Sequence, residues 1–325
     1  MTPAGQPCYI SGCRLHAANP TFEITDRTGI DMTYLLLIAT TFLWGGTFIA
    51  GRLVAGEIPP FSASFLRFVI AGAALLPIIA ATEGMPALPT RRQFLPILLL
   101  GLSGIFSYNA FFFTGLSHIT ASRAALIIAT TPLCITLVST LLYREPLTRL
   151  RGIGILLSLT GALLVISNGH PTMIFAGGFG PGEFSLLGCV VSWTVYTFVG
   201  KSVLTTMRPL PCVFYAILAG TLLLAGPALI EGLPALLPSI DVVGWASLAY
   251  LGIGGTSLGF SWYYLGIKRI GPSRAGVFIN LVPVFALLQS WLLLSETLKP
   301  IVLAGGFMVC TGVYLTNRRA RLHRP

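Results

Sequence analysis

The scarcity of charged residues is the first informative feature of this chain. Asp, Glu, Lys and Arg make up only 9% of its 325 residues, whereas a soluble domain averages about 25%. Because 54% of the residues are hydrophobic, there are too few polar side chains to cover a water-facing surface. Several apolar runs approach the ~20 residues needed to cross a bilayer. The composition therefore excludes a soluble protein and predicts an all-α polytopic membrane protein.

Acidic side chains are the scarcest charged type, and none is expected near the bilayer midplane. All ten fall in a tail, a loop or a helix end. Proton-coupled pumps use Asp, Glu or His inside the membrane, so we expect weak or absent carboxylate-mediated proton coupling. The sequence also lacks an HExxH motif, paired aspartates, a membrane His cluster and a CxxC spacing. It therefore predicts no enzyme, no metal site and no cofactor, and its six cysteines are expected to be free thiols.

The net charge of +10 has a simple explanation in a membrane protein. A basic soluble domain would suggest a nucleic-acid partner. In a polytopic chain, however, Lys and Arg collect in the loops that set membrane orientation. We therefore expect the lipid bilayer and a small-molecule substrate as partners, and no nucleic acid.

An internal repeat is the strongest positive signal in the sequence. Trp44 corresponds to Trp193, and Glu83 corresponds to Glu231. Farther along, one constant offset relates the pairs Gly115/Gly266, Ser122/Ser273, Arg123/Arg274, Pro132/Pro283, Glu145/Glu296, Gly154/Gly305 and Gly161/Gly312. In a membrane chain, such a repeat is typical of transporters built from two related halves.

Ten transmembrane helices are predicted, five in each half. The first five spans are Met32–Ala50, Phe61–Ala81, Phe94–Leu116, Thr120–Tyr143 and Leu150–Ser167. The second five are Glu183–Ser202, Pro209–Ile230, Asp241–Ile267, Pro272–Ser295 and Pro300–Asn317. We expect a polar tail over residues 1–31, repeats over 32–167 and 183–317, a linker over 168–182 and a basic tail over 318–325. Because Met32 directly begins the first span, we hypothesise that residues 1–31 are not part of the native protein.

The two halves are predicted to be inverted with respect to the membrane. Five spans are an odd number, so the second half must begin on the opposite side from the first. The loops agree, because Arg91 and Arg92 follow the segment at Glu83, whereas no Lys or Arg follows the matching segment at Glu231. Matching loops thus exchange their basic charge, as the positive-inside rule requires. This predicts a multi-pass cell-membrane protein with both termini in the cytoplasm, working as a monomer.

These motifs resemble the drug/metabolite transporter superfamily, specifically its ten-helix EamA-type members. The residues that carry the likeness are Trp44-Gly-Gly-Thr-Phe, Arg67-Phe, Ala121-Ser-Arg-Ala with Pro132 and Glu145, and Pro272-Ser-Arg-Ala with Pro283 and Glu296. The resemblance covers about residues 32–317. It implies ten helices in two inverted repeats, both termini in the cytoplasm, a central cavity, and export of amino acids or other small metabolites.

Prolines near the middle of spans four and nine mark a candidate midplane site. Pro132 and Pro283 free the carbonyl groups of Ile128 and Ile279, four residues back. In lipid, such a group needs a partner from protein or from water in a cavity. Helices broken at matching positions therefore favour a binding site, although a packing kink is the alternative. Asn280 adds a polar side chain close to Pro283.

Aromatic and polar side chains provide the other cavity candidates. Trp44 and Trp193 occupy matching positions and are suited to wall a cavity for an apolar or aromatic solute, although simple helix packing explains them equally well. Tyr196 shares a helix face with Trp193. Polar-aromatic clusters at matching depth are Tyr108 with Asn109 in span three and Ser261-Trp262-Tyr263-Tyr264 in span eight, of which we select Tyr108, Asn109 and Trp262.

Arg67 is the one charge placed well within a predicted span. Intramembrane charges are functional by default, so Arg67 is a candidate partner for a substrate carboxylate. It is equally suited to lock helices together or to extend to the outer interface. Its repeat counterpart is Tyr215, so the charge is not doubled. The resemblance, in which an arginine stands here across dissimilar substrates, favours the structural role.

The leading functional hypothesis is a secondary transporter that exports small organic metabolites, such as amino acids, by alternating access. The alternative within transport is a nucleotide-sugar or sugar-phosphate carrier. Such phosphorylated solutes call for several inward Lys or Arg residues, and only Arg67 qualifies. A membrane-embedded enzyme lacks a catalytic constellation, and a channel is disfavoured because inverted repeats are typical of carriers.

Overall fold

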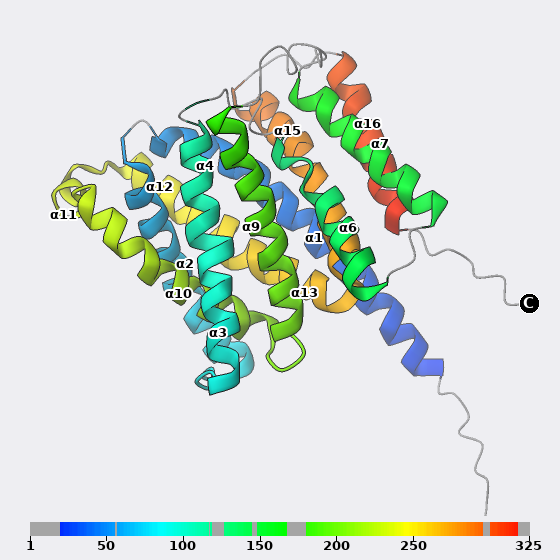
Figure 1. The fold of residues 1–325 in the computed structure, drawn as a ribbon, viewed down its shortest axis with the longest axis horizontal. Helices are drawn as coiled ribbons and strands as arrows, with labels where there is room; N and C mark the ends of the chain where they lie inside the picture. The colour runs from blue at the N-terminus through cyan, green and yellow to red at the C-terminus, as the bar shows by residue number, and fades with distance from the viewer. Residues whose placement is uncertain are drawn as a thin grey trace, which may run out of the picture.

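The computed structural model describes residues 20–55, 57–116, 118, 127–144, 148–167, 180–294 and 300–317. Every regular element within those ranges is helical (Figure 1). The first half contains α1 (Pro20–Ala55), α2 (Pro60–Glu83), α3 (Arg91–Leu100), η1 (Gly101–Ser107), α4 (Tyr108–Leu116), α6 (Thr131–Tyr143) and α7 (Arg149–Ile166). The second half contains α9 (Pro181–Val203), α10 (Pro209–Ile230), α11 (Leu233–Leu236), η2 (Leu237–Ser239), α12 (Val242–Ala249), η3 (Tyr250–Leu258), α13 (Gly259–Ile270), α14 (Pro272–Val277), η4 (Phe278–Leu281), α15 (Val282–Leu294) and α16 (Pro300–Asn317).

Seven described helices are long and apolar enough to cross a membrane, against the ten that the sequence predicts. The number rises to eight if the pair Leu233–Ser239 and Val242–Ile270, bent by 115°, forms one span. The predicted fourth span is described only in part, because residues 119–126 lie outside the described ranges. Its described helix is Thr131–Tyr143, with 13 residues.

The first helix begins earlier than the sequence predicts. Helix α1 starts at Pro20, and its apolar span covers Met32–Gly51. The last part of the predicted tail, residues 20–31, therefore continues the helix. Residues 1–19 and 318–325, which make up the rest of both predicted tails, lie outside the described ranges.

Helices α2 and α10 run antiparallel and join the two halves. Glu231, just after α10, accepts a hydrogen bond from the backbone N–H of Ser62 in the first turn of α2, at 2.6 Å. At the other end, Glu83 of α2 forms an ion pair with Arg208, the N-cap residue of α10, at 3.0 Å. Since each helix ends beside the start of the other, the repeat-related Glu83 and Glu231 lie at opposite ends of a pair about 35 Å long.

Two π-helices, η1 and η3, occur at matching places in the two halves, and each packs on the other half. A Cβ atom at Gly101 would lie 2.6 Å from the backbone nitrogen of Gly220 in α10. One at Gly252 would lie 2.8 Å from the carbonyl oxygen of Arg67 in α2. Glycine is therefore required for these close approaches. Single π-turns are rare and frequently lie at functional sites.

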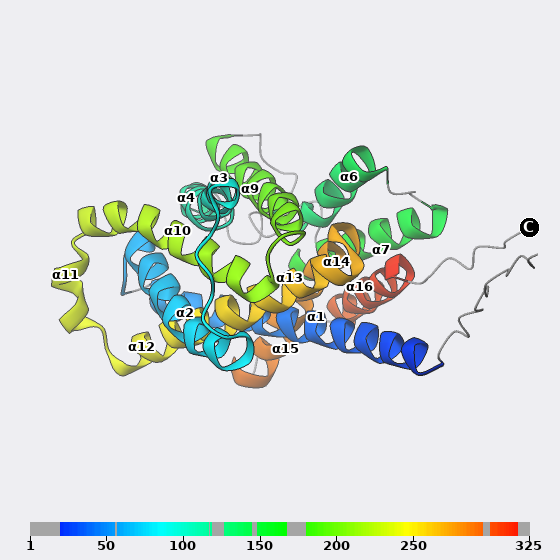
Figure 2. The same cartoon turned by 90° about the horizontal axis from the view of Figure 1, so that it is seen from below.

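Helices α7 and α16 form a second pair across the halves, side by side in both overall views (Figures 1 and 2). Glycines set their contact. A Cβ atom at Gly161 would lie 2.5 Å from the carbonyl oxygen of Gly305, and one at Gly312 would lie 2.5 Å from that of Gly154. The four glycines that the sequence repeat identified therefore meet at this crossing, Gly161 against Gly305 and Gly154 against Gly312, and they let the two backbones touch.

Candidate functional site

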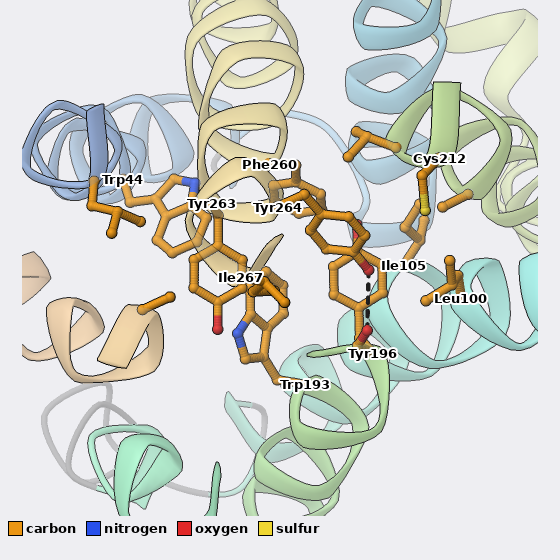
Figure 3. Packing of buried hydrophobic residues seen from close by; sticks show 14 of the residues in the cluster. Trp44, Leu100, Ile105, Trp193, Tyr196, Cys212, Phe260, Tyr263, Tyr264 and Ile267 are labelled. Carbon is orange, nitrogen blue, oxygen red and sulfur yellow. Dashed lines mark hydrogen bonds between the residues drawn. The ribbon is translucent and has the colours of Figure 1, made fainter. Parts of the chain in front are cut away.

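Aromatic rings from both halves meet in the interior, where helices α1, α9 and α13 come together (Figure 3). The group consists of Trp44, Tyr108, Trp193, Tyr196, Phe260, Tyr263 and Tyr264, called here the aromatic cluster. Ring centroids lie 5.5 Å apart for Trp44 and Trp193, and 4.9 Å apart for Tyr196 and Tyr264. These separations and the tilted or edge-to-face geometry are favourable for aromatic pairs.

Glycines make room for these large rings. A Cβ atom at Gly259 would lie 2.6 Å from the Trp44 indole nitrogen. Gly104 of η1 similarly lies against the Tyr196 ring, and Gly200 of α9 against the Tyr264 ring. The Tyr264 hydroxyl then donates a hydrogen bond to the backbone carbonyl of Tyr196 at 3.0 Å, drawn in Figure 3. Contacts with the backbone thus hold the rings in place. The resemblance implies a central cavity, whereas in this structure the interior is filled by the packed rings of the cluster.

The two repeat-related tryptophans differ in their hydrogen bonding. The Trp44 indole N–H donates to the carbonyl oxygen of Gly255 in η3 at 2.8 Å. The Trp193 indole N–H and the Tyr196 hydroxyl are buried without a well-aligned hydrogen bond in the described structure, and their nearest polar neighbours are the hydroxyls of Tyr263 and Tyr264. A buried polar group without a partner is costly. The second-half side of the cluster therefore holds two buried polar groups whose hydrogen bonding is incomplete.

Arg67 reaches the edge of this region from α2. Its Nε–H donates to the hydroxyl of Thr256 in η3 at 2.8 Å, and its guanidinium carbon lies 5.2 Å from the Phe68 ring centroid. Thr256 directly follows Gly255, the residue that binds Trp44. The side chain thus points to the helix η3 inside the bundle instead of extending along α2 to the interface.

The cluster contains some of the predicted site residues and leaves others out. Tyr108 belongs to it, with its ring 5.5 Å from that of Trp193. Asn109 is occupied elsewhere, because its Nδ2 donates to the carbonyl of Ile105 at 2.6 Å and its Oδ1 accepts from Ser64 at 3.3 Å. It therefore ties η1 and α4 to α2 and has little left to offer a ligand.

Trp262 takes no part in the aromatic cluster. It is half-buried and forms none of the ring contacts among the described residues, whereas its neighbours Tyr263 and Tyr264 are fully buried in the cluster. Phe260 was missed by the sequence reasoning. The signal for it was helical spacing, because Phe260 shares a face of α13 with Tyr263 and Tyr264, three and four residues later.

The expectation that the prolines leave carbonyl oxygens unpaired is wrong for the described structure. Pro132 is buried in the first turn of α6, and the Thr131 hydroxyl donates to the freed carbonyl of Ile128 at 2.5 Å. Around Pro283, in α15, the chain tightens into the 3-10 helix η4, and the N–H of Val282 binds the carbonyl of Ile279. A local hydroxyl and a tighter turn thus satisfy both oxygens.

Asn280 connects spans instead of lining the cluster. Its Nδ2 donates to the hydroxyl of Ser158 in α7 at 2.9 Å, and its Oδ1 is buried without a partner. Of the charged residues that the sequence repeat pairs, Arg123, Glu145 and Glu296 lie outside the described residues.

A cavity of about 370 Å³ lies away from the cluster, between the start of α3 and the turn that joins α9 to α10. Its lining residues are Thr90, Arg92, Gln93, Pro96, Ser202, Val203, Thr205 and Thr206. None of them belongs to the aromatic cluster, and sequence reasoning singled out none of them as a candidate.

Comparison with known proteins gives a consistent family. The EamA-like transporter family matches residues 31–167 and, a second time, residues 180–318. The uncharacterized transporter YyaM of Bacillus subtilis is 29% identical over 289 residues, covering 89% of this chain and 94% of that protein. One solved crystal structure is 23% identical in sequence to this chain and has a TM-score of 0.70. The match covers 88% of this chain and 97% of the solved one, and at this identity it supports the fold alone.

Two relatives carry more specific names. A probable terminal-alkyne amino-acid exporter of Streptantibioticus cattleyicolor is 30% identical over 287 residues, covering 87% of this chain and 92% of that protein. The aromatic amino acid exporter YddG of Ancylobacter novellus is 29% identical over 253 residues, covering 77% and 84%. These names describe transporters, in agreement with the expectation that the chain is not an enzyme. With both halves matched by one family, this chain is a multi-pass membrane protein of the EamA-like transporter family.

Proposed function

We propose that this protein exports small organic metabolites, amino acids or related compounds, as a secondary transporter that works by alternating access. The single observation that carries the proposal is the aromatic cluster. It joins Trp44 of the first half to Trp193 of the second, with ring centroids 5.5 Å apart. A site shared by both halves is what rocking of one repeat against the other requires.

The cluster also favours the substrate class. Its rings provide an apolar surface, and the N–H of Trp193 and the hydroxyl of Tyr196, which form no well-aligned hydrogen bond within the protein, provide polar contacts for an oriented solute. Two relatives are named as exporters of amino acids, one of them aromatic, which agrees with an aromatic-lined site. Trp44, Tyr108, Trp193 and Tyr196 are therefore the predicted site residues that we retain as substrate contacts.

The proposed architecture is ten spans in two inverted repeats, 32–167 and 183–317, joined by a linker over 168–182. The antiparallel contact of α2 with α10 supports it, because Glu83 and Glu231 occupy opposite ends of that pair. The matching π-helices η1 and η3 support it as well. The distribution of basic loops favours cytoplasmic termini in a cell membrane, and a monomer is sufficient to form the site.

Counterflow in proteoliposomes tests this function. Vesicles with purified protein are loaded with an excess of one unlabelled amino acid, and uptake of the same labelled compound is followed. A carrier gives a transient overshoot that saturates with concentration. We expect the overshoot for aromatic or large apolar amino acids. Uptake no different from protein-free vesicles across the twenty amino acids would contradict the proposal, and uptake linear in concentration would indicate a channel.

A further inference from the structure

Arg67 is only partly committed to protein contacts. Its Nε–H binds the Thr256 hydroxyl at 2.8 Å, and the guanidinium lies over the Phe68 ring. A guanidinium carries five N–H donors, four of them on the two Nη atoms. Within the described part of the chain, no hydrogen bond and no carboxylate partner engages those four. The residue as a whole is half-buried, and its guanidinium lies inside the bundle.

A purely structural role does not require this charge. Helices α2 and η3 are already held together by the close approach of Gly252 to the Arg67 carbonyl and by the hydrogen bond from the Ser257 hydroxyl to the Ala71 carbonyl, at 2.8 Å. A neutral donor of similar length at position 67 would still supply the hydrogen bond to Thr256, although a weaker one. A charge inside the membrane is costly. Among the described residues, no carboxylate pairs with the Nη groups of Arg67 to offset this cost.

The π-helix η3 places this cation at the edge of the aromatic cluster. A Cβ atom at Gly255 would lie 3.8 Å from an Nη atom of Arg67, and the Gly255 carbonyl binds the Trp44 indole. Phe68 connects the same helix to the cluster, with its ring 6.4 Å from that of Phe260. An anionic group at Arg67 would therefore lie next to the rings of the aromatic cluster.

We propose that the Nη groups of Arg67 bind the carboxylate of the substrate while its aromatic or large apolar side chain packs on the aromatic cluster. This inference deepens the proposed function and rests on it. Planar guanidinium groups bind carboxylates through two parallel hydrogen bonds. All ten acidic residues of the chain lie outside the apolar spans or at their ends, so none is expected to pair with a substrate ammonium group. The site therefore selects carboxylates, and the amino group is dispensable.

Three related compounds separate the groups that matter. L-phenylalanine has both charged groups, 3-phenylpropanoate lacks the amino group, and phenethylamine lacks the carboxylate. Binding to purified protein is followed by quenching of tryptophan fluorescence, because Trp44 and Trp193 lie in the cluster. For the wild type we expect the two carboxylates to bind at least about tenfold more tightly than the amine.

Variants at Arg67 then test the assignment. In Arg67→Gln, we expect the affinity for both carboxylates to fall about tenfold or more, and that for phenethylamine to stay unchanged. Arg67→Lys keeps the charge without the planar fork and should give an intermediate loss. Tyr215→Phe is the matched control, because it removes a polar group at the repeat-related position, where the hydroxyl binds the carbonyls of Pro86 and Ala87. Its selectivity should equal that of the wild type.

Failure of this inference is distinguishable from failure of the proposed function. Wild-type binding of 3-phenylpropanoate no tighter than that of phenethylamine overturns the carboxylate assignment, whatever the counterflow assay shows. An equal loss of affinity for all three compounds in Arg67→Gln and Arg67→Lys also overturns it, because that is the signature of a structural lock. Selective binding without any counterflow supports the assignment and contradicts transport.

Discussion

Glu231 binds Ser62 across the two halves of the protein. One carboxylate oxygen accepts the Ser62 backbone N–H at 2.6 Å and its hydroxyl at 2.8 Å, and the other accepts the N–H of Phe61 at 3.1 Å. The first N–H groups of a helix have no intrahelical partner and favour negative charge. The N-cap residue of α2, Pro59, supplies no side-chain cap. A residue of the second half thus caps a helix of the first.

Replacing Glu231 should therefore weaken the contact between the halves. In Glu231→Ala, we expect a loss of about 1–2 kcal/mol, because two backbone donors lose their acceptor. Thermal unfolding of detergent-purified protein measures it. Glu83→Ala is the control at the other end of the pair, where the partner Arg208 is 56% exposed and water replaces the ion pair. A larger loss in Glu83→Ala than in Glu231→Ala would contradict this account.

The crossing of α7 and α16 should tolerate no side chain at Gly161. A Cβ atom there meets the carbonyl oxygen of Gly305 at 2.5 Å, so we expect Gly161→Ala to lower stability by about 1–3 kcal/mol. Gly152→Ala, in the same helix, is the control because nothing lies within 4 Å of its Cβ atom. It should be neutral or slightly stabilising. Equal melting temperatures for the two variants would show that the helices do not cross there.

The inverted arrangement predicts opposite accessibility for Ala87 and Ala235, which occupy matching positions and are both exposed. Each is replaced by cysteine in a background without native cysteines, and intact cells are treated with a membrane-impermeant maleimide. We expect labelling at position 235, and at position 87 only after the membrane is permeabilised. Labelling of both from the same side would refute inverted repeats.

Transport should depend little on a proton gradient, because the chain places no acidic residue at the expected midplane. In proteoliposomes with an imposed pH gradient, we expect the substrate to equilibrate without accumulating. The same vesicles with equal pH on both sides serve as the reference. Strong uphill accumulation that a protonophore abolishes would contradict this prediction.

The sequence identified which repeat-related residues lie at the contacts between the halves, but it did not identify which residue faces which. The repeat pairs Gly154 with Gly305 and Gly161 with Gly312, but in the structure Gly161 touches Gly305 and Gly154 touches Gly312, since the helices cross antiparallel. Trp44 and Trp193 were expected in one region, and their rings are in contact. Such matched positions are visible in a repeat because each half needs the same packing.

Details that depend on rotation and local hydrogen bonding were not predictable. Trp262 was selected over Tyr263, because composition alone does not give the rotational phase of α13. The Ile128 carbonyl was expected to be free, but the Thr131 hydroxyl donates a hydrogen bond to it. This bond depends on the rotamer of Thr131, which the sequence does not give. The commitment of Asn109 to Ser64 is likewise a contact between distant helices that no local pattern reveals.

Transport by Trp193→Phe tests most directly whether the aromatic cluster is the transport site. The substitution keeps a ring and removes an N–H that forms no well-aligned hydrogen bond in the protein. The smaller ring leaves a void in the packed cluster and lowers stability, so thermal unfolding is measured alongside transport to confirm that the variant is folded. A solute that uses this N–H loses one hydrogen bond. In counterflow assays, we predict a rise in KM of about three- to tenfold for Trp193→Phe and no change for the control Trp262→Phe. Unchanged counterflow in Trp193→Phe, or an equal effect in Trp262→Phe, would contradict the account.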